Sequence, residues 1–424
     1  MNPASPFPLG AIDHRVHRGR IFGIRPDDLL RHVHVMGRSG MGKSTVLENL
    51  VAEAMERGMG CAVIDPHGDL VDRLLGLVPK GRTNDLVLFD AADPERPAGW
   101  NPLDARAPPH LVASAVLGAF KKTFGESWGP RLDHVYRNSL LALLATRAPT
   151  LLGVTRMLSD PKYRASVAGQ VRDPLVELFW TREFTGWNPN FIAEALSPVQ
   201  NKVAAALTSL PLRLILGQRT SSVRPAEVLA MGKILLVRLA KGALGEDAAA
   251  LLGTLLVGAF QAATYARAAL PPAARTPFLL VVDEFPSFVT GSFGELLSEA
   301  RKYGVGLVLA HQHLGQVEPS LRHSLFGNVG TRLLFSVGAE DAEILVREVS
   351  PEHDARDLVS LAARQMVVRL AVGAAITRPF TATSLPPREL ASAARISQLV
   401  RLSRERYGRD RRDVEGAIRS QLLG

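Results

Sequence analysis

Short runs of apolar residues alternate with helical periodicity in two separate parts of the chain. These runs cover 32–37, 61–66 and 85–90 in the first part, and 233–240, 278–284, 305–311, 331–338 and 365–373 in the second. A strand buried on both faces is apolar at consecutive positions, and parallel strands need helical crossovers between them. The pattern therefore predicts an α/β fold with a mostly parallel sheet and helices on both faces.

The strand pattern disappears between these two parts, and helical periodicity dominates from about Asp104 to Gln218. After "SLPP" at 384–387, two short helices flank the basic stretch "RLSRERYGRDRR". The predicted organisation is an N-terminal segment with the first part of the α/β domain (1–103), an inserted all-α domain (104–218), the second part of the α/β domain (219–385) and a basic helical tail (386–424).

One segment, residues 248–266, is uncharged over nearly the length of a membrane span. It is rich in Ala, Gly, Thr and Gln, has no flanking aromatic residues and follows a predicted strand, so we expect a buried helix rather than a span. The N-terminus lacks the continuous apolar stretch of a signal peptide. We therefore expect no integral membrane segment.

Composition narrows the class of protein further. The 424 residues carry a formal net charge of +9, mostly from arginine, which is compatible with a polyanionic partner. The single cysteine, Cys61, excludes an internal disulfide framework and a cysteine-rich zinc site. It also fits a reducing compartment, so the expected location is the cytoplasm.

The stretch "VHVMGRSGMGKSTVLENL", residues 33–50, contains the pattern G-x-x-x-x-G-K-[ST] between a predicted strand and a predicted helix. Its glycines let the backbone wrap around phosphate oxygens, and the helix N-terminus faces the anion. Lys43 is expected to reach the β- and γ-phosphates, and Ser44 to hold Mg²⁺. The predicted phosphate-binding residues are Gly37, Arg38, Ser39, Gly40, Met41, Gly42, Lys43, Ser44 and Thr45.

Further candidate residues lie at the ends of two later apolar runs, 278–284 and 305–311. In "FLLVVDEF", Asp283 is placed to order the metal's water shell, and Glu284 to polarise a water that attacks the γ-phosphate. Gln312 ends "VGLVLAHQ", where its amide can sense the γ-phosphate. A glutamate directly after the aspartate favours hydrolysis of a nucleotide over simple binding.

Two arginines are candidates for a charge supplied to a neighbouring subunit's nucleotide. Arg301 lies on the predicted helix before the strand that ends at Gln312, away from the phosphate loop. Arg332, in "GTRLLF", is the competing candidate. The plainer interpretations are a solvated residue for Arg301 and a structural salt bridge for Arg332.

Several motifs in this order resemble the HerA/FtsK clade of ring-forming DNA-pumping ATPases. They are "HVHVMGRSGMGKST", "AVIDPHGDL", "WGPRLDHVYRNSLLALL", "LLVVDEFPSF", "EARKYGVGLVLAHQHLGQV" and "NVGTRLLFSVGAEDAE". Within the clade they are most similar to the TraD/TraG type of type IV secretion coupling protein, over roughly residues 15–424. The resemblance implies a RecA-like P-loop core, ATP and Mg²⁺ as cofactors, a homo-oligomeric ring of six subunits, and DNA as partner.

The resemblance also implies roles for individual residues. It implies Lys43, Glu284 and Gln312 as catalytic residues, Ser44 and Asp283 as metal ligands, and Arg301 as the arginine supplied in trans. In "DPHGDL", residues 65–70, Asp65 is expected to support the site, and His67 to form hydrogen bonds rather than to bind metal.

One departure from the family concerns the membrane. Membrane-bound coupling proteins carry N-terminal transmembrane helices, whereas the roughly thirty residues before the first predicted strand are not membrane-like. We expect a soluble protein, with peripheral recruitment to the inner membrane as the alternative. Secretion or relaxosome proteins are the further partners that this alternative implies.

The preferred function is a Mg²⁺- and ATP-dependent ring that translocates DNA, as in conjugative transfer. Two alternatives stay open: an ATPase that drives a protein substrate or assembly of a secretion apparatus, and a nucleotide-switched clamp that does not translocate. Candidate DNA contacts are 240–246, 121–131 and the arginines of 401–412, each with an ordinary solvated surface as the competing interpretation. The strand preference, the direction of movement and the biological context stay open.

Overall fold

The structure, a computed structural model, describes residues 5–13, 17–104, 107–125 and 128–423. The chain forms two compact units that interleave along the sequence. The sheet unit comprises Met1–Leu88, Ala226–Arg238 and Ala263–Arg401, and the helical unit comprises Phe89–Pro225, Leu239–Ala262 and Leu402–Gly424. The helical unit thus contains the segment 104–218, together with two segments that the sequence pattern placed in the α/β domain and in the tail.

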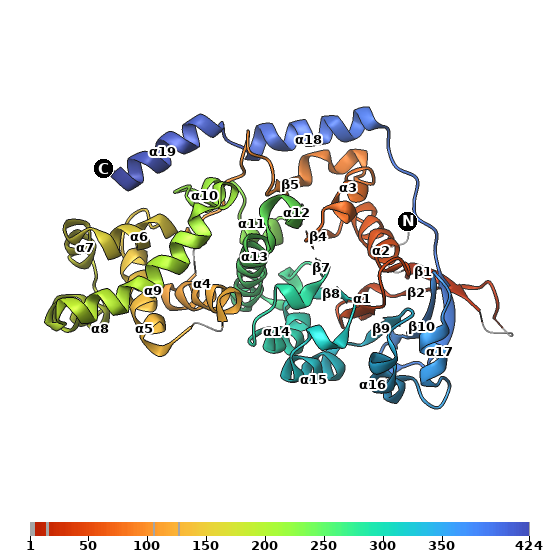
Figure 1. The fold of residues 1–424 in the computed structure, drawn as a ribbon. Helices are drawn as coiled ribbons and strands as arrows, with labels where there is room; N and C mark the ends of the chain where they lie inside the picture. Colours follow the sequence, from red (N-terminus) through yellow and green to blue (C-terminus); the bar gives the residue numbers. More distant parts are fainter. Residues whose placement is uncertain (1–4, 14–16, 105–106, 126–127, 424) are drawn as a thin grey trace. The chain divides into compact units, whose positions relative to one another are not determined.

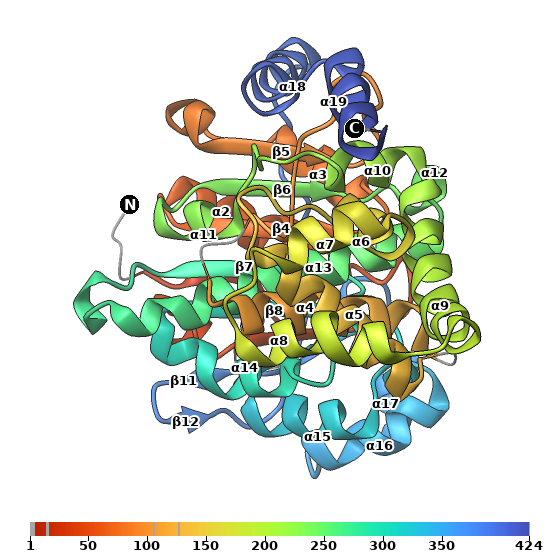
Figure 2. The same cartoon turned by 90° about the vertical axis from the view of Figure 1, so that its left-hand side faces the viewer.

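Eleven strands of the described chain form one mixed sheet, in the order β2–β1–β13–β10–β9–β3–β8–β7–β4–β6–β5. Figure 2 shows β5, β6, β4, β7 and β8 succeeding one another in this order. The strands are β1 Phe7–Ile12, β2 Ile21–Ile24, β3 Val33–Met36, β4 Gly60–Asp65, β5 Leu86–Asp90, β6 Ile234–Arg238, β7 Phe278–Val282, β8 Val305–His311, β9 Thr331–Leu334, β10 Gln365–Arg369 and β13 Phe380–Ser384. From β9 through β3, β8, β7 and β4 to β6, all neighbouring pairs are parallel, as the apolar runs predicted.

The other end of the sheet is antiparallel and was not predicted from the sequence. There β9 pairs with β10, β10 with β13, β13 with β1 and β1 with β2. β1 contains Pro8 and Gly10, which are unfavourable in strands, and β13 ("FTATS") is too polar to stand out as an apolar run. A small hairpin of β11 Ala371–Val372 and β12 Ala375–Ile376 follows β10.

Helices cover both faces of the sheet unit (Figure 1). On one face, α2 Lys43–Glu56 and α3 Asp69–Leu75 bury apolar side chains in the core that includes Val33 and Val35. On the other, α16 Ala339–Val349 and α17 Ala355–Ser360 pack with Met36 of the same strand. The sheet unit also contains all or most of α1 Pro26–Leu29, α11 Pro225–Ala230, α14 Phe293–Glu299, α15 Pro319–Asn328 and the first part of α18 Ala393–Tyr407.

Five of the helices described in the helical unit begin at proline. Asp160, Asp173 and Asn188 cap three of them by accepting backbone N–H groups of the first turn. The helices are α4 Pro109–Thr123, α5 Pro130–Leu144, α6 Leu151–Ser159, α7 Pro161–Ala168, α8 Pro174–Leu178, α9 Pro189–Thr208, α10 Leu210–Leu216, α12 Lys241–Leu244 and α19 Arg411–Leu423. Side chains of α4, α5, α6 and α9 pack together as its core.

The C-terminal arginines differ from the solvated charge run expected at 401–412. Arg404 binds the carboxylate of Asp93 through two nitrogens, at 2.5 and 2.9 Å, and Arg411 binds Glu415 at 2.8 Å. Helix α19 contacts α6 and α10 and buries Val414 and Ile418. This part of the tail is therefore a packed element of the helical unit.

The uncharged segment 248–266 lies within α13 Glu246–Ala266. By length and composition, Glu246–Ala269 is the one described helical stretch that could cross a membrane. Its most apolar window is 61% buried inside the structure. This burial agrees with the predicted buried helix.

Candidate nucleotide-binding site

The predicted phosphate loop lies between the end of β3 and the start of α2. Gly40 and Gly42 have φ angles of +76° and +115°, which side chains other than glycine rarely adopt. A Cβ atom at Gly37 would lie 2.5 Å from the Cβ of Phe335, so the loop passes too close to its neighbour for any larger residue. The described pocket is lined on this side by Ser39, Gly40, Gly42, Lys43, Ser44 and Thr45. The predicted residues Gly37, Arg38 and Met41 shape the loop without lining the pocket.

The Lys43 ammonium is buried and folded back onto its own loop. Its Nζ donates to the carbonyl oxygens of Gly37 at 2.7 Å and Arg38 at 3.2 Å. Burial lowers the pKa of Lys43, while the charges of Glu284 and Asp283 act in the opposite direction. The loop carbonyls therefore hold a cation beside the pocket, where it is available to an anionic ligand.

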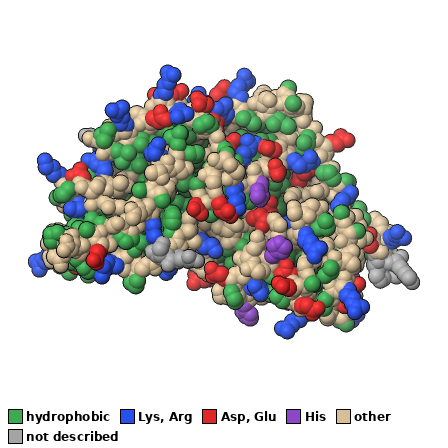
Figure 3. Space-filling model, viewed as in Figure 1, with side chains coloured by type: hydrophobic (Ala, Val, Ile, Leu, Met, Phe, Trp, Pro, Cys, Tyr) green, Lys and Arg blue, Asp and Glu red, His purple; other side chains and the backbone are tan. Residues whose placement is uncertain are grey.

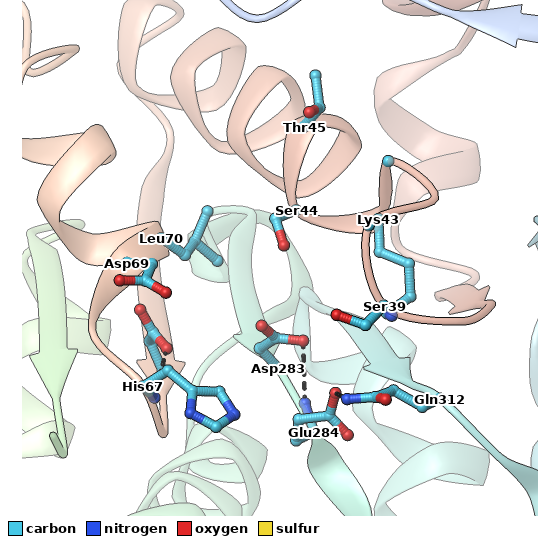
Figure 4. Close-up of a pocket in the computed structure, with 13 residues that line it drawn as sticks. Ser39, Lys43, Ser44, Thr45, His67, Asp69, Leu70, Asp283, Glu284 and Gln312 are labelled. Atoms are coloured by element: carbon cyan, nitrogen blue, oxygen red, sulfur yellow. Dashed lines mark hydrogen bonds between the residues drawn. The ribbon is translucent and has the colours of Figure 1, made fainter. Parts of the chain in front are cut away.

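Four parallel strands bring their carboxyl ends together at this pocket. Gly37 follows β3, Asp65 ends β4, Asp283 follows β7 and Gln312 follows β8, and neighbouring parallel strands share these ends. Figure 4 shows Ser44, Lys43, Asp283, Glu284 and Gln312 around one space. The structure thus brings together the predicted residues that come from separate motifs.

Asp283 has the perturbed carboxyl group of the site. Burial, together with the nearby charges of Glu284 and Asp65, raises its pKa to about 6, while the N–H of Glu284 and the charge of Lys43 act in the opposite direction. A carboxylate in this environment gains from a cation, because the cation offsets both the lost hydration and the repulsion. The site therefore favours a bound cation next to Asp283.

Glu284 and Gln312 form a direct contact at the pocket. Gln312 Nε2 donates to Glu284 Oε1 at 2.7 Å. The backbone of Glu284 has a φ of +47° and a ψ of +45°, a left-handed conformation that costs a non-glycine residue about 1 kcal/mol. The surrounding structure stabilises this strained turn, which aims the carboxylate into the pocket.

The loop after β4 supplies the remaining wall. The buried carboxylate of Asp65 accepts the backbone N–H groups of His67 at 2.9 Å and Val71 at 3.1 Å. These bonds shape the turn that starts α3, and Figure 4 shows the His67 ring extending towards Asp283 and Glu284. Asp65 therefore supports the site as expected, while Asp69 and Leu70 are lining residues that the sequence did not single out.

The donor set at the pocket fits Mg²⁺ bound together with a nucleotide. Ser44 offers a hydroxyl and Asp283 a carboxylate, the oxygen ligands that Mg²⁺ takes in such sites alongside phosphate and water. Among the described residues, no group of three or more His, Cys, Asp or Glu side chains forms a metal cage. Mg²⁺ keeps several waters and seldom uses an all-protein cage, so these two observations agree.

The two candidate arginines differ sharply in environment. Arg332 is 2% exposed, and its NH1 binds Glu348 at 2.9 Å while its NH2 donates to the Phe326 carbonyl. Arg301 is exposed in a short 3₁₀ turn, Ala300–Tyr303, before the amino end of β8. Since β8 is seven residues long, Arg301 lies roughly 20 Å along the sheet from Gln312 and cannot reach its own subunit's pocket.

Comparisons with known proteins agree with this site and fold. The family model described as "Helicase HerA, central domain" matches residues 22–103. The fold is similar to that of the bacterial conjugative coupling protein TrwB, with a TM-score of 0.62, 15% identity and 87% of each chain covered. It is also similar to the plasmid coupling protein TrwB in complex with ADP and Mg²⁺, with a TM-score of 0.62, 16% identity, and 88% of this chain and 90% of that chain covered.

A third solved structure, VirB4 of Thermoanaerobacter pseudethanolicus, has a TM-score of 0.60 and 16% identity, with 93% of this chain and 99% of that chain covered. No curated protein matches the chain. The site is that of a P-loop protein, and residues 22–103 match the model of the HerA central domain. The fold is similar to that of the TrwB coupling protein and of VirB4, in agreement with the predicted resemblance and the RecA-like fold class.

The buried surroundings of the site were not predicted from the sequence. His34 and His311 contact each other between β3 and β8. The backbone N–H of Arg364 donates to the Met41 carbonyl of the phosphate loop. These contacts join residues far apart in the chain, and no local pattern marks them.

Proposed function

We propose that the chain is a Mg²⁺-dependent ATPase that works as a homo-oligomeric ring, of six subunits by analogy with its family, and translocates DNA. The observation that carries the ATPase proposal is the Glu284–Gln312 hydrogen bond in a pocket that also presents Lys43, Ser44 and Asp283. A pocket that only bound nucleotide would not need a carboxylate in a strained turn, held by a neighbouring amide.

Each residue has a role in this proposal. The loop N–H groups and Lys43 hold the β- and γ-phosphates, and Ser44 and Asp283 hold Mg²⁺. Bound Mg²⁺ supplies charge that stabilises the phosphate oxygens. Glu284 orients and polarises the attacking water, while Gln312 fixes Glu284 and contacts the γ-phosphate. The structures of TrwB with ADP and Mg²⁺ and with a non-hydrolysable ATP analogue support the choice of ligands.

The position of Arg301 supports the proposal of a ring. Among the described residues that line the pocket there is no arginine, and Arg332 is occupied in a buried ion pair. Arg301 is exposed at the opposite end of β8, so a second copy of the chain can bring it to the γ-phosphate of the first. Hydrolysis then depends on assembly.

DNA as the substrate rests on the family model and on the coupling-protein fold rather than on a basic surface. Figure 3 shows acidic and basic side chains interspersed on the face that it draws. In each of two candidate segments, one basic side chain has an internal partner: Lys241 pairs with Glu246, and Arg131 lies over the Phe191 ring. In 121–131, residues 126–127 lie outside the described part of the chain.

The test is phosphate release by the purified full-length chain, measured without DNA, with single-stranded DNA and with duplex DNA, at two salt concentrations. Lys43→Ala and Glu284→Gln are the inactive variants, and Lys80→Ala, an exposed lysine away from the pocket, is the matched control. We expect DNA to raise a wild-type rate that the control keeps and both pocket variants lose.

The other outcomes separate the alternatives. Wild-type turnover that ignores both DNA forms at both salt concentrations would contradict the DNA proposal and favour a protein substrate or assembly of a secretion apparatus. Nucleotide binding with no turnover in any condition would favour a clamp. The cytoplasm, with peripheral recruitment to the inner membrane by a partner, is the location that goes with the motor proposal.

A further inference from the structure

Two buried histidines lie beside the catalytic pocket without lining it. His34, in the middle of β3, and His311, the last residue of β8, are both 0% exposed. Their Nε2 atoms are 2.8 Å apart, and their rings stack at an interplanar angle of 18°. Burying polar rings costs free energy unless their nitrogens are hydrogen-bonded, so the bonds around this pair decide its state.

The hydrogen bonds determine which ring nitrogen carries each proton. His311 Nδ1 lies 2.9 Å from the carbonyl oxygen of His313, which can only accept, so Nδ1 carries a hydrogen. Burial lowers the pKa of His311 to about 4 and that of His34 well below its ordinary value, so both rings are neutral. His311 Nε2 therefore accepts, and His34 Nε2–H donates to it.

The second ring nitrogen of His34, Nδ1, agrees with this assignment of protons. The remaining nitrogen, Nδ1, then carries a lone pair, and no described residue donates to it. Arg332 is the register partner of His34 on the neighbouring strand β9. The charge of Arg332 adds to burial in lowering the pKa of His34, so it favours the neutral ring.

On the other side of the pair, His311 is connected to the hydrogen bond between Gln312 and Glu284. The His311–His313 bond closes a turn whose middle residue is Gln312, and the N–H of Leu314 continues this fixed segment by donating to Asp341 at 3.1 Å. Gln312 leaves this turn towards Glu284. The direction of the Gln312 amide thus depends on the His311 tautomer.

We propose that His34 is a positioning residue for hydrolysis: its Nε2–H fixes His311 in the tautomer that holds the Gln312 turn, so that Gln312 engages Glu284. This role rests on the proposed ATPase function. It adds the requirement that His34, the second residue of β3, supplies a hydrogen-bond donor. His34 does not touch the nucleotide in this mechanism.

The kinetic test compares two variants of similar size. His34→Gln keeps an N–H donor at about the reach of Nε2, whereas His34→Met has none. We expect His34→Met to lower kcat about tenfold with KM changed less than about twofold, and His34→Gln to recover most of the loss, as for other residues that orient a functional group. Equal losses in both variants, together with equal falls in thermal midpoint, would show a packing role and overturn the proposal, as would full activity in His34→Met.

A second measurement does not depend on hydrolysis. Long-range ¹H–¹⁵N correlation of the histidine rings in the wild-type full-length chain reports the protonated nitrogen directly. We expect His34 to be protonated on Nε2 and His311 on Nδ1, and His34→Met to disturb the His311 tautomer. The opposite tautomers would overturn the relay. A wild-type chain with the expected tautomers but no ATP hydrolysis would instead contradict the proposed function.

Discussion

Gln312 Nε2 donates a hydrogen bond to Glu284 Oε1 across 2.7 Å, joining the carboxyl ends of the neighbouring parallel strands β8 and β7. The bond restricts rotation of the Glu284 carboxylate, and the backbone of Glu284 is already in a strained, left-handed conformation. It therefore couples the orientation of the proposed catalytic base to Gln312, the residue proposed to contact the γ-phosphate.

The first prediction concerns this contact. Gln312→Leu removes the amide at similar volume, so Glu284 loses its orientation while the phosphate loop is unchanged. We expect kcat for ATP hydrolysis to fall by about 10²-fold, in the range of acid–base positioning effects, with nucleotide affinity nearly unchanged. Stopped-flow phosphate release and titration with a fluorescent ATP analogue measure the two quantities. Gln170→Leu, on the exposed surface of the helical unit, is the control, and equal rates in the two variants would contradict the role of Gln312.

The second prediction concerns pH and Asp283. Its pKa in the folded chain is about 6, above the ordinary 3.8, so the folded state binds the proton more tightly than the unfolded state does. Stability without nucleotide therefore falls as pH rises from about 4 to about 6 and stays reduced above that. Asp283→Asn removes this penalty, and we expect its free energy of unfolding at pH 7.5 to exceed that of the wild type by about 1–2 kcal/mol.

Chemical denaturation of both proteins at pH 5 and pH 7.5 checks this prediction. The difference in free energy of unfolding between Asp283→Asn and the wild type should be smaller at pH 5, where the wild-type Asp283 carboxyl is mostly protonated. Glu343→Gln, an exposed change on α16, should show no such pH-dependent gain. A loss of stability in Asp283→Asn at pH 7.5 would mean that the carboxylate is well accommodated without a cation.

The sequence predicted the parts of the site that local pattern specifies. The phosphate loop is a strand–turn–helix signal, and Asp283 and Gln312 each end an apolar run, so their meeting at one sheet edge follows from parallel pairing. The His34–His311 contact depends on two strands separated by more than 270 residues, and no periodicity reveals it. The ion pair of Arg404 with Asp93 was missed for the same reason, because a charge run looks solvated until its partners are known.

The third prediction separates Arg301 from Arg332. Arg301→Ala removes an exposed charge, so we expect unchanged stability and a fall in kcat of about 10³-fold, the effect of losing an arginine supplied in trans. Arg332→Ala leaves a cavity and removes the buried ion pair of Arg332 with Glu348. Glu348 retains its ion pair with Arg369. We expect it to lower the free energy of unfolding by about 2–4 kcal/mol.

Mixing experiments test whether Arg301 acts between subunits. Arg301→Ala subunits keep an intact pocket, and Glu284→Gln subunits keep Arg301, so each supplies what the other lacks. Mixed rings should therefore recover part of the hydrolysis that neither variant shows alone. If subunit exchange is verified by mass measurement and no activity returns, the trans role is wrong.

The fourth prediction concerns the C-terminal helix α19. Ile418 is buried against Gly217. Gln421 Nε2 donates to the Gly217 carbonyl at 3.0 Å, and Gln421 Oε1 accepts from the Thr150 hydroxyl at 3.2 Å. If the helix is a packed element of the helical unit, Ile418→Ala should cost about 2–4 kcal/mol, the usual range for a buried Ile or Leu cut to Ala. Arg419→Ala, one residue further and exposed, should stay within about 0.5 kcal/mol of the wild type.

Hydrogen exchange in residues 151–159 and 210–216 locates the effect, because α19 packs on these two helices. Protection there that is equally unaffected by both changes would mean that the helix is a solvated tail, and the ion pairs of Arg404 and Arg411 would then add little to stability.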